Sequence, residues 1–316
     1  LSCLVGSEMC IRDRDKNGEI FVAGIMEHIE EAGIHSGDSA CSLPPYSVSK
    51  ETQNKIIEWV SKIANEINVV GLMNTQLAIK DKKIYVLEVN PRASRTVPFV
   101  AKSKGIPVAK IAAKVMVGEN LNSILNDYQI NELKNFNVKE SVFPFNKFDG
   151  VDLILGPEMK STGEVMGIDE TFLSSYIKSQ IACGNILPSK GTVFISIDND
   201  NKKFIIEIAQ KLKELDFNLL ATKGTAEYLN TNNIKTKIVN KVKEGNPHVV
   251  DSLINNEIQL VINTTKTQSS IRDSYSIRRT SLMYNIPYYT TIAGAKVAVD
   301  AIEPVSYTHL RAHETG

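Results

Sequence analysis

The chain has 316 residues, of which 42% are hydrophobic and 23% charged, and its 36 basic and 36 acidic side chains balance. This length predicts about two domains whose cores need no disulfide or metal for stability. The balanced charge argues against a nucleic-acid partner, and no apolar run approaches the ~20 residues of a membrane span, so we expect a soluble protein.

The two ends of the chain differ in pattern from the rest. Residues 1–14 (LSCLVGSEMCIRDR) and 304–316 (PVSYTHLRAHETG) resemble translated sequencing adaptors and join abruptly to well-patterned sequence. We exclude both from fold reasoning, as one excludes an expression scar. We therefore expect non-native ends on a piece of a longer natural chain.

Residues 15–187 mix a hairpin with helices, which is typical of an α+β domain. Ser49 is a plausible N-cap of an amphipathic helix, and Asp81, Lys82 and Lys83 form the expected turn of the hairpin. In chain order we expect a strand, a loop rich in Gly, Ser and Pro, the capped helix, the hairpin and a further helix, over residues 19–26, 32–47, 49–67, 74–80 with 83–89, and 100–117.

Residues 188–303 alternate short apolar runs with amphipathic stretches five times. Such units predict a doubly wound parallel sheet of five strands, with ligands at the carboxyl ends of the strands. The turn residues around Pro188 and Gly191 mark the boundary between the two domains. The strands are expected over residues 192–198, 217–222, 236–240, 259–265 and 287–292, and the helices over 202–215, 224–232, 248–256, 274–286 and up to about 303.

The hairpin predicts a group of oxygen ligands. If residues whose numbers sum to 164 lie opposite each other, Gln76 faces Glu88 and Asn74 faces Asn90, and Glu88 and Asn90 share one strand face. The carboxylate and the amides of Gln76 and Asn90 suit Mg²⁺, which completes its shell with phosphate and water. A slip of one residue would separate the set, and an ordinary surface hairpin is the alternative.

The sequence after the hairpin carries a family resemblance. Leu87-Glu-Val-Asn-Pro-Arg-Ala-Ser-Arg95 resembles the metal-binding segment of ATP-grasp ligases, and Thr96-Val-Pro-Phe-Val100 narrows the resemblance to the carbamoyl phosphate synthetase large subunit. The segments at residues 24–30, 33–39, 143–148 and 155–166 are similar to the same family, so the resemblance covers about residues 15–303.

The resemblance implies the end of the second ATP-grasp unit, an antiparallel sheet with helices, followed by a regulatory domain. The implied activity is ATP-dependent phosphorylation of carbamate to carbamoyl phosphate, which feeds pyrimidine and arginine biosynthesis. The implied cofactors are ATP and two ions of Mg²⁺ or Mn²⁺, with K⁺ as a further candidate. By resemblance, Gln76 and Glu88 hold one ion and Glu88 and Asn90 the other, Arg92 and Arg95 act in catalysis, and the nucleotide contacts are Gly33, Ile34, His35 and Ser36 together with Gln76 and Glu88.

Residues 188–303 resemble the methylglyoxal-synthase-like fold. Residues 264–270 lack the aspartate of a true methylglyoxal synthase, which favours regulation over catalysis. A nucleotide monophosphate such as UMP or IMP would bind Lys202, Thr222, Thr225, Lys241, Asn263 and Thr265. A second pocket, for ornithine in some relatives, would use Glu30, Asp38, Glu140 and Thr290, for which scattered surface carboxylates are the alternative.

The resemblance also implies partners and a compartment. We expect a separate glutaminase small subunit, an oligomeric whole enzyme and a cytoplasmic location, and we expect this piece to be inactive alone. Two alternatives stay open: another ATP-grasp carboxylase, such as a biotin-dependent one, or a stand-alone nucleotide-binding regulatory module.

Overall fold

The structure, a computed structural model, describes residues 5–130, 132–145 and 152–302 and divides into two compact units. The first unit comprises the described residues of Leu1–Ser141 and Gly156–Ser179, and the second those of Val142–Leu155 and Gln180–Gly316. The chain therefore enters the second unit, returns to the first at Gly156, and enters the second again after Ser179. Much of the two segments expected to be non-native lies outside the described residues.

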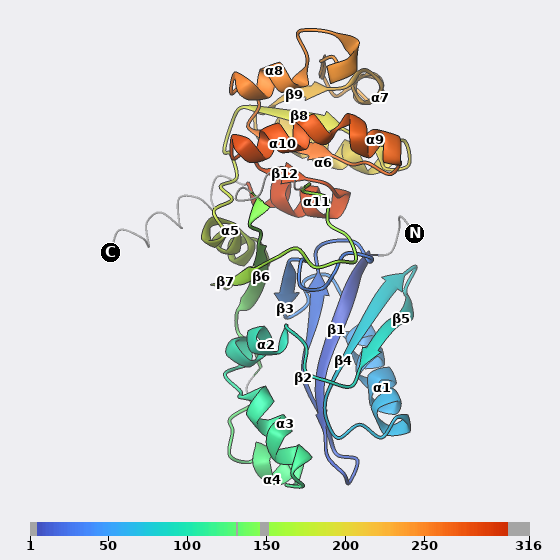
Figure 1. Cartoon of the computed structure of the whole chain (residues 1–316), viewed down its shortest axis with the longest axis vertical. Helices are drawn as coiled ribbons and strands as arrows, with labels where there is room; N and C mark the ends of the chain where they lie inside the picture. The colour runs from blue at the N-terminus through green and yellow to red at the C-terminus, as the bar shows by residue number, and fades with distance from the viewer. Residues whose placement is uncertain (1–4, 131, 146–151, 303–316) are drawn as a thin grey trace, which may run out of the picture. The chain divides into compact units, whose positions relative to one another are not determined.

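A seven-stranded sheet forms the first unit, in the order β5-β4-β1-β2-β3-β6-β7 (Figure 1). The pairs from β5 through to β6 are antiparallel. Residues 5–14, which we left out of the fold reasoning, form β1 and pair with both β2 and β4. The strands are β1 (Val5–Arg14), β2 (Ile20–His28), β3 (Cys41–Leu43), β4 (Gly71–Lys80), β5 (Lys83–Asn90), β6 (Phe136–Val142) and β7 (Gly163–Asp169).

Helices cover both faces of this sheet. Helix α1 (Lys50–Glu66) begins after Ser49, whose hydroxyl accepts the Thr52 N–H as predicted for an N-cap. Its buried residues Ile56, Val60 and Ala64 recur every four positions, so one helix face packs against the sheet. The other sheet face packs against α2 (Val97–Lys104), α3 (Val108–Met116) and α4 (Leu121–Leu125), and α5 (Phe172–Ala182) follows β7.

The single helix predicted over residues 100–117 is wrong, because the chain forms two helices there. Gly105 adopts φ 66°, the left-handed conformation that commonly ends a helix. Pro107 then precedes α3 and cannot donate a main-chain hydrogen bond to a continuing helix.

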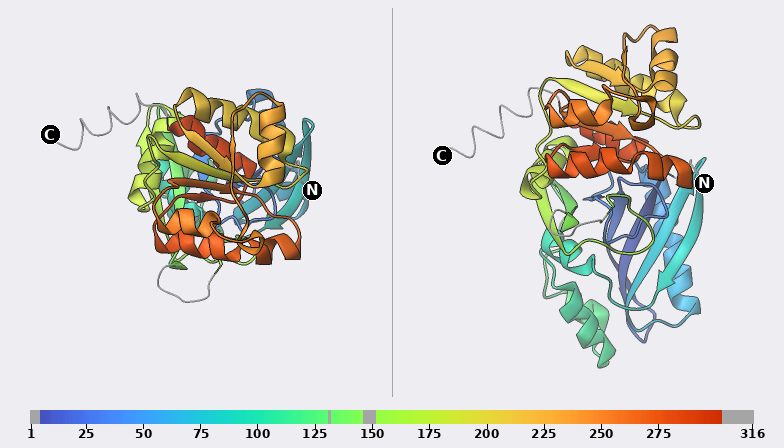
Figure 2. Two further views of the ribbon diagram at one scale, coloured as in Figure 1. Left: turned by 90° about the horizontal axis from the view of Figure 1, so that it is seen from above. Right: turned by 45° about the horizontal axis from the view of Figure 1, so that its top comes forward.

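The second unit contains the predicted parallel sheet, in the order β10-β9-β8-β11-β12, with helices on both faces (Figure 2). All four strand pairs are parallel. Phe194 and Val261 pack against α8 and α10 on one face, and α6 contacts α11. The elements are β8 (Thr192–Ser196), α6 (Lys202–Glu214), β9 (Asn218–Ala221), α7 (Lys223–Thr231), β10 (Lys237–Ile238), α8 (Val249–Ile254), β11 (Leu260–Asn263), α9 (Gln268–Asp273), α10 (Tyr275–Met283), β12 (Tyr288–Tyr289) and α11 (Ile292–Ala301).

Candidate functional site

The pairing of β4 with β5 brings the predicted ligands together, but the turn between the two strands differs from the predicted one. Asp81 and Lys82 have φ of 50° and 62°, which makes a two-residue turn and pairs Lys80 with Lys83. The predicted three-residue turn is therefore wrong, and this register alone would place Leu87 opposite Gln76.

A bulge in β5 corrects that register before the site. Leu77 pairs with Val86, and the next pair is Gln76 with Glu88, so Leu87 is the extra residue. The predicted pairs of Gln76 with Glu88 and of Asn74 with Asn90 are confirmed. Bulges commonly re-aim side chains next to functional sites, and this one keeps the carboxylate and the amides on one side.

A cavity of about 320 Å³ lies beside these strands in the first unit. Four separate segments line it, so the sequence positions that we predicted for catalysis and for ATP and metal binding converge in space. All nine of them line the cavity: Gly33, Ile34, His35, Ser36, Gln76, Glu88, Asn90, Arg92 and Arg95.

Sequence reasoning gave no role to other residues of the cavity wall. Asn74 is 3% exposed, and its Nδ2 is buried without a hydrogen-bond partner. Its spacing of two from Gln76 placed it on the same strand face, so strand alternation could have identified it. Pro157 reaches the cavity from far along the chain, and no local pattern signals that approach.

A buried lysine holds the loop that lines one side of the cavity. Lys139 is 1% exposed, and its Nζ donates to the carbonyls of Ser36 and Gly37, each at 3.3 Å. The Gly37 carbonyl also accepts the hydroxyls of Ser141 at 2.7 Å and Ser161 at 3.1 Å. A loop with this many bonds to strands and neighbouring segments is positioned before any ligand arrives.

The segment after Gly156 is tied to the same loop. The Gly156 carbonyl accepts the His35 N–H at 2.8 Å. The buried Asp38 carboxylate accepts the N–H groups of Lys160 at 2.8 Å and Ser161 at 2.9 Å. Because the main-chain N–H of His35 is used inside the protein, the nucleotide contact predicted at His35 is not available through that group. Its Nδ1 accepts the Gly37 N–H at 3.0 Å.

Titratable groups cluster next to this loop in the first unit. Burial, then the charge of Glu140, raises the pKa of Glu30 to about 8, and burial with the charge of Lys139 lowers the pKa of His28 to about 3. Between pH 4.5 and 8 the folded state therefore binds more protons at Glu30 than the unfolded state does. The stability linked to Glu30 consequently falls as pH rises through that range.

A second cavity of about 240 Å³ lies at the carboxyl end of the parallel sheet in the second unit. Four of the six residues predicted to bind a nucleotide effector line it: Thr222, Lys241, Asn263 and Thr265. These residues lie at or just after the carboxyl ends of three different strands, β9, β10 and β11, as expected for a ligand site on the carboxyl rim of such a sheet.

The other two predicted residues are placed differently. Thr225 is 2% exposed, and its hydroxyl accepts the Ile197 N–H at 3.2 Å, so it supports the cavity wall without lining it. Lys202 is the first residue of α6, as predicted, and its Nζ lies 5.9 Å from the ring centre of Tyr228 in α7.

Asp198 is a cavity residue that the sequence reasoning missed. Its carboxylate accepts the Thr264 hydroxyl and the Asn201 amide, each at 2.7 Å, which joins the ends of β8 and β11. Asp198 is followed by Asn-Asp-Asn before a helix, which indicates a turn, and nothing in that pattern shows which strand the Asp198 carboxylate contacts.

The residues predicted for a second effector pocket fall in both units. Glu30, Asp38 and Glu140 belong to the first unit and Thr290 to the second, so this pocket stays a prediction. Both oxygens of Asp38 already accept main-chain hydrogen bonds.

The side chains of the first cavity suit a divalent cation only if a bound ligand supplies further oxygen donors. Within the described part of the chain, no group of three His, Cys, Asp or Glu side chains could hold a metal ion. Glu88 with the amide oxygens of Gln76 and Asn90 gives hard oxygen donors, to which phosphate oxygens would have to be added. This combination matches the usual surroundings of Mg²⁺ in proteins.

Two family models match the two regions just described. Residues 10–124 match the carbamoyl-phosphate synthase L chain, ATP binding domain, and residues 204–290 match the MGS-like domain. The chain therefore carries a region that matches an ATP-binding domain, followed by a region that matches an MGS-like domain, in the order predicted from the sequence.

Curated relatives specify the class further. The chain is 51% identical to the carbamoyl phosphate synthase large chain of Myxococcus xanthus over 94% of its own length, and 51% identical to that of Archaeoglobus fulgidus over 91%. It spans 27% of each relative. The chain is therefore similar, over about nine tenths of its own length, to roughly a quarter of these carbamoyl phosphate synthase large chains, and the alternative of a biotin-dependent carboxylase is not favoured.

The biotin carboxylase subunit of pyruvate carboxylase aligns with 56% of this chain and 44% of its own, at 14% identity and a TM-score of 0.44. Among the residues that the structure describes, no helix is long and apolar enough to cross a membrane.

Proposed function

We propose that the chain is the C-terminal part of a carbamoyl phosphate synthase large chain, in which the first unit phosphorylates carbamate with ATP. The convergence of the hairpin, the loop of residues 33–36 and the two arginines on one cavity carries this proposal. A polyphosphate and a small anionic acceptor are the ligands that such a mixture of oxygen donors and guanidinium groups fits.

The residues of the cavity supply what phosphoryl transfer requires. The reaction needs positioning and charge neutralisation more than covalent catalysis. Arg92 and Arg95 contribute two positive charges near the reacting oxygens, and the loop held by Lys139 forms a fixed wall for the nucleotide. No nucleophile or general base is required of the protein.

Gln76, Glu88 and Asn90 would hold Mg²⁺ or Mn²⁺ together with the ATP phosphates. The bound cation would supply further neutralisation of the phosphate charge. Glu88 provides the only carboxylate among the described residues that line this cavity, so its charge should contribute most to the affinity for the cation.

The remaining parts of the proposal follow from the relatives. A glutaminase small subunit would deliver ammonia, the whole enzyme would be oligomeric and cytoplasmic, and the product would enter pyrimidine and arginine biosynthesis. The cavity at Lys241 and Asn263 would bind UMP or IMP as a regulator, and K⁺ and ornithine are further candidate ligands.

Partial reactions of the complete enzyme test the catalytic assignment. Glu88→Gln in the full large chain with its small subunit should abolish ATP synthesis from carbamoyl phosphate and ADP, while bicarbonate-dependent ATP hydrolysis by the other ATP-grasp unit persists. Glu51→Gln, an exposed change on α1, is the matched control and should leave both reactions intact. Near-normal ATP synthesis by Glu88→Gln would remove Glu88 from the site.

A further inference from the structure

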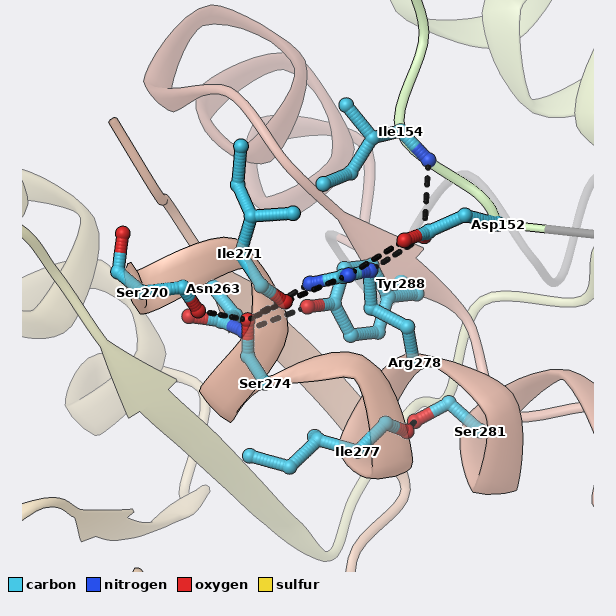
Figure 3. A network of polar contacts seen from close by, with 10 residues as sticks. All are labelled: Asp152, Ile154, Asn263, Ser270, Ile271, Ser274, Ile277, Arg278, Ser281 and Tyr288. Carbon is cyan, nitrogen blue, oxygen red and sulfur yellow. Dashed lines mark hydrogen bonds and ion pairs between the residues drawn. The ribbon is translucent and has the colours of Figure 1, made fainter. Parts of the chain in front are cut away.

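A series of buried polar contacts begins at the second-unit cavity and ends at Asp152 (Figure 3). Asn263 lines the cavity and is 2% exposed, and its Nδ2 donates to the Tyr288 hydroxyl at 2.6 Å. The same hydroxyl hydrogen bonds with the Arg278 side chain. One phenol thus joins a cavity residue to a buried cation.

Arg278 makes the strongest contacts of this series. It is 1% exposed, and its Nε and Nη2 each lie 2.5 Å from an oxygen of Asp152. Its Nη1 donates to the Ser274 hydroxyl at 2.6 Å, and Ser274 also lines the cavity. Bidentate pairs of this kind fix geometry as well as charge, so Asp152 cannot shift without the guanidinium.

Asp152 lies just before the point where the chain returns to the first unit. Its carboxylate also accepts the Ile154 N–H at 3.3 Å, and the chain then passes through Gly156 and Pro157. Gly156 accepts the His35 N–H, and Pro157 lines the catalytic cavity. Five peptide units, about 18 Å at most when extended, therefore separate Asp152 in the second unit from Pro157 in the wall of the first cavity.

We propose that Tyr288 and Arg278 are positioning residues through which a nucleotide at Asn263 sets the position of residues 152–157. The inference rests on the proposed effector site and adds the side chains that connect it to the catalytic unit. The covalent chain from Asp152 to Pro157 connects the second unit to the wall of the first cavity.

The contacts explain how a ligand could change this segment. A ligand that hydrogen bonds with the Asn263 amide competes with the Tyr288 hydroxyl for that group. Tyr288 then alters its bond to Arg278, and the guanidinium redistributes its donors between Ser274 and Asp152. Because an Arg–carboxylate fork is either aligned or not, a small change at the cavity can shift Asp152 between discrete positions.

Hydrogen exchange of the full 316-residue chain with and without UMP tests the inference. In the unsubstituted chain, saturating UMP should change amide exchange in peptides covering residues 152–161 by about fivefold or more, the lower end of typical coupling factors. Tyr288→Phe keeps the ring and removes the connecting hydroxyl. It should still bind UMP and melt within a few degrees of the parent chain, but lose the response at residues 152–161.

Tyr289→Phe is the matched control, because it removes a neighbouring hydroxyl that contacts Asn185 instead of the cavity. It should keep the full response. Asp152→Asn provides a second test at the other end of the series and should lose the response as Tyr288→Phe does. UMP binding without any response in the unsubstituted chain, or a full response in Tyr288→Phe, would overturn the inference alone. Failure of UMP to bind at all would overturn the effector assignment and the inference with it.

Discussion

Asp38→Asn tests whether the hydrogen bonds of the Asp38 carboxylate hold the wall of the first cavity. The Asp38 side chain is 1% exposed, and its two oxygens accept the N–H groups of Lys160 and Ser161. Asparagine has the same shape but offers one acceptor oxygen, and its NH₂ group would face one of the two donors. One main-chain N–H would then be buried without a partner.

The size of the effect follows from these two bonds. A hydrogen bond to a charged group contributes about 1.5–3 kcal/mol, and a buried donor left unpaired costs about 1–3 kcal/mol. Losing one bond, weakening the other and leaving a donor unpaired should lower the free energy of unfolding of the first unit by about 3–5 kcal/mol.

Urea unfolding followed by tryptophan fluorescence measures this directly. The single tryptophan of the chain, Trp59, lies in α1 and therefore reports on the first unit. Asp81→Asn makes the same chemical change in the exposed hairpin turn, where asparagine tolerates the positive φ, and should have little effect. A loss below about 0.5 kcal/mol for Asp38→Asn, the size of an ordinary surface change, would show that these two bonds do not stabilise the wall.

Three further predictions concern the effector cavity, pH and the isolated chain. Lys241→Ala should weaken UMP binding about 10- to 100-fold by calorimetry, because it removes one charge-assisted contact, whereas Lys237→Ala on an exposed strand should change it little. The unsubstituted chain should lose a few kcal/mol of unfolding free energy between pH 5 and pH 8 that Glu30→Gln does not lose, because the pKa of Glu30 is raised to about 8. Denaturation curves at both pH values measure this difference, and an equal effect of the substitution at both would contradict it. The chain alone should make no carbamoyl phosphate from bicarbonate, and detectable synthesis would show that it needs no other part.

The elements of the second unit were largely predictable because their signals are local, whereas only three of the seven strands of the first unit, β2, β4 and β5, were expected. Hydrophobic periodicity and turn residues gave the five parallel strands within a few residues of their observed ends, and Ser49 marked the start of α1. The break between α2 and α3 was also readable in principle, since Gly105 and Pro107 are helix-ending residues.

In the hairpin, the predicted strand pairing is correct although the turn from which it was predicted is wrong. The predicted pairing of Gln76 with Glu88 is observed, although it results from a two-residue turn and a bulge at Leu87 whose effects cancel. Turn type depends on φ at two residues, and neither Asp81 nor Lys82 is glycine, so the residue types did not reveal it.

The contacts that support the two cavities join residues far apart in sequence. Lys139 reaches Ser36, and Arg278 reaches Asp152, across about a hundred residues or more. A buried lysine in a strand and a buried arginine in a helix read as ordinary surface residues when only the sequence is available, because burial depends on the whole fold. The contacts of Lys139 and Arg278 can therefore be identified only in the structure.

We propose that Gln76, Glu88 and Asn90 place a metal–nucleotide complex in the first cavity. The most direct measurement replaces Mg²⁺ by Fe²⁺ in the complete enzyme, generates hydroxyl radicals at the bound ion with ascorbate and peroxide, and maps the cleaved peptide bonds. We predict ATP-dependent cleavage around residues 74–76 and 88–92 that disappears in Glu88→Gln. Cleavage of this unit only at other positions, or an unchanged pattern in Glu88→Gln, would contradict the account.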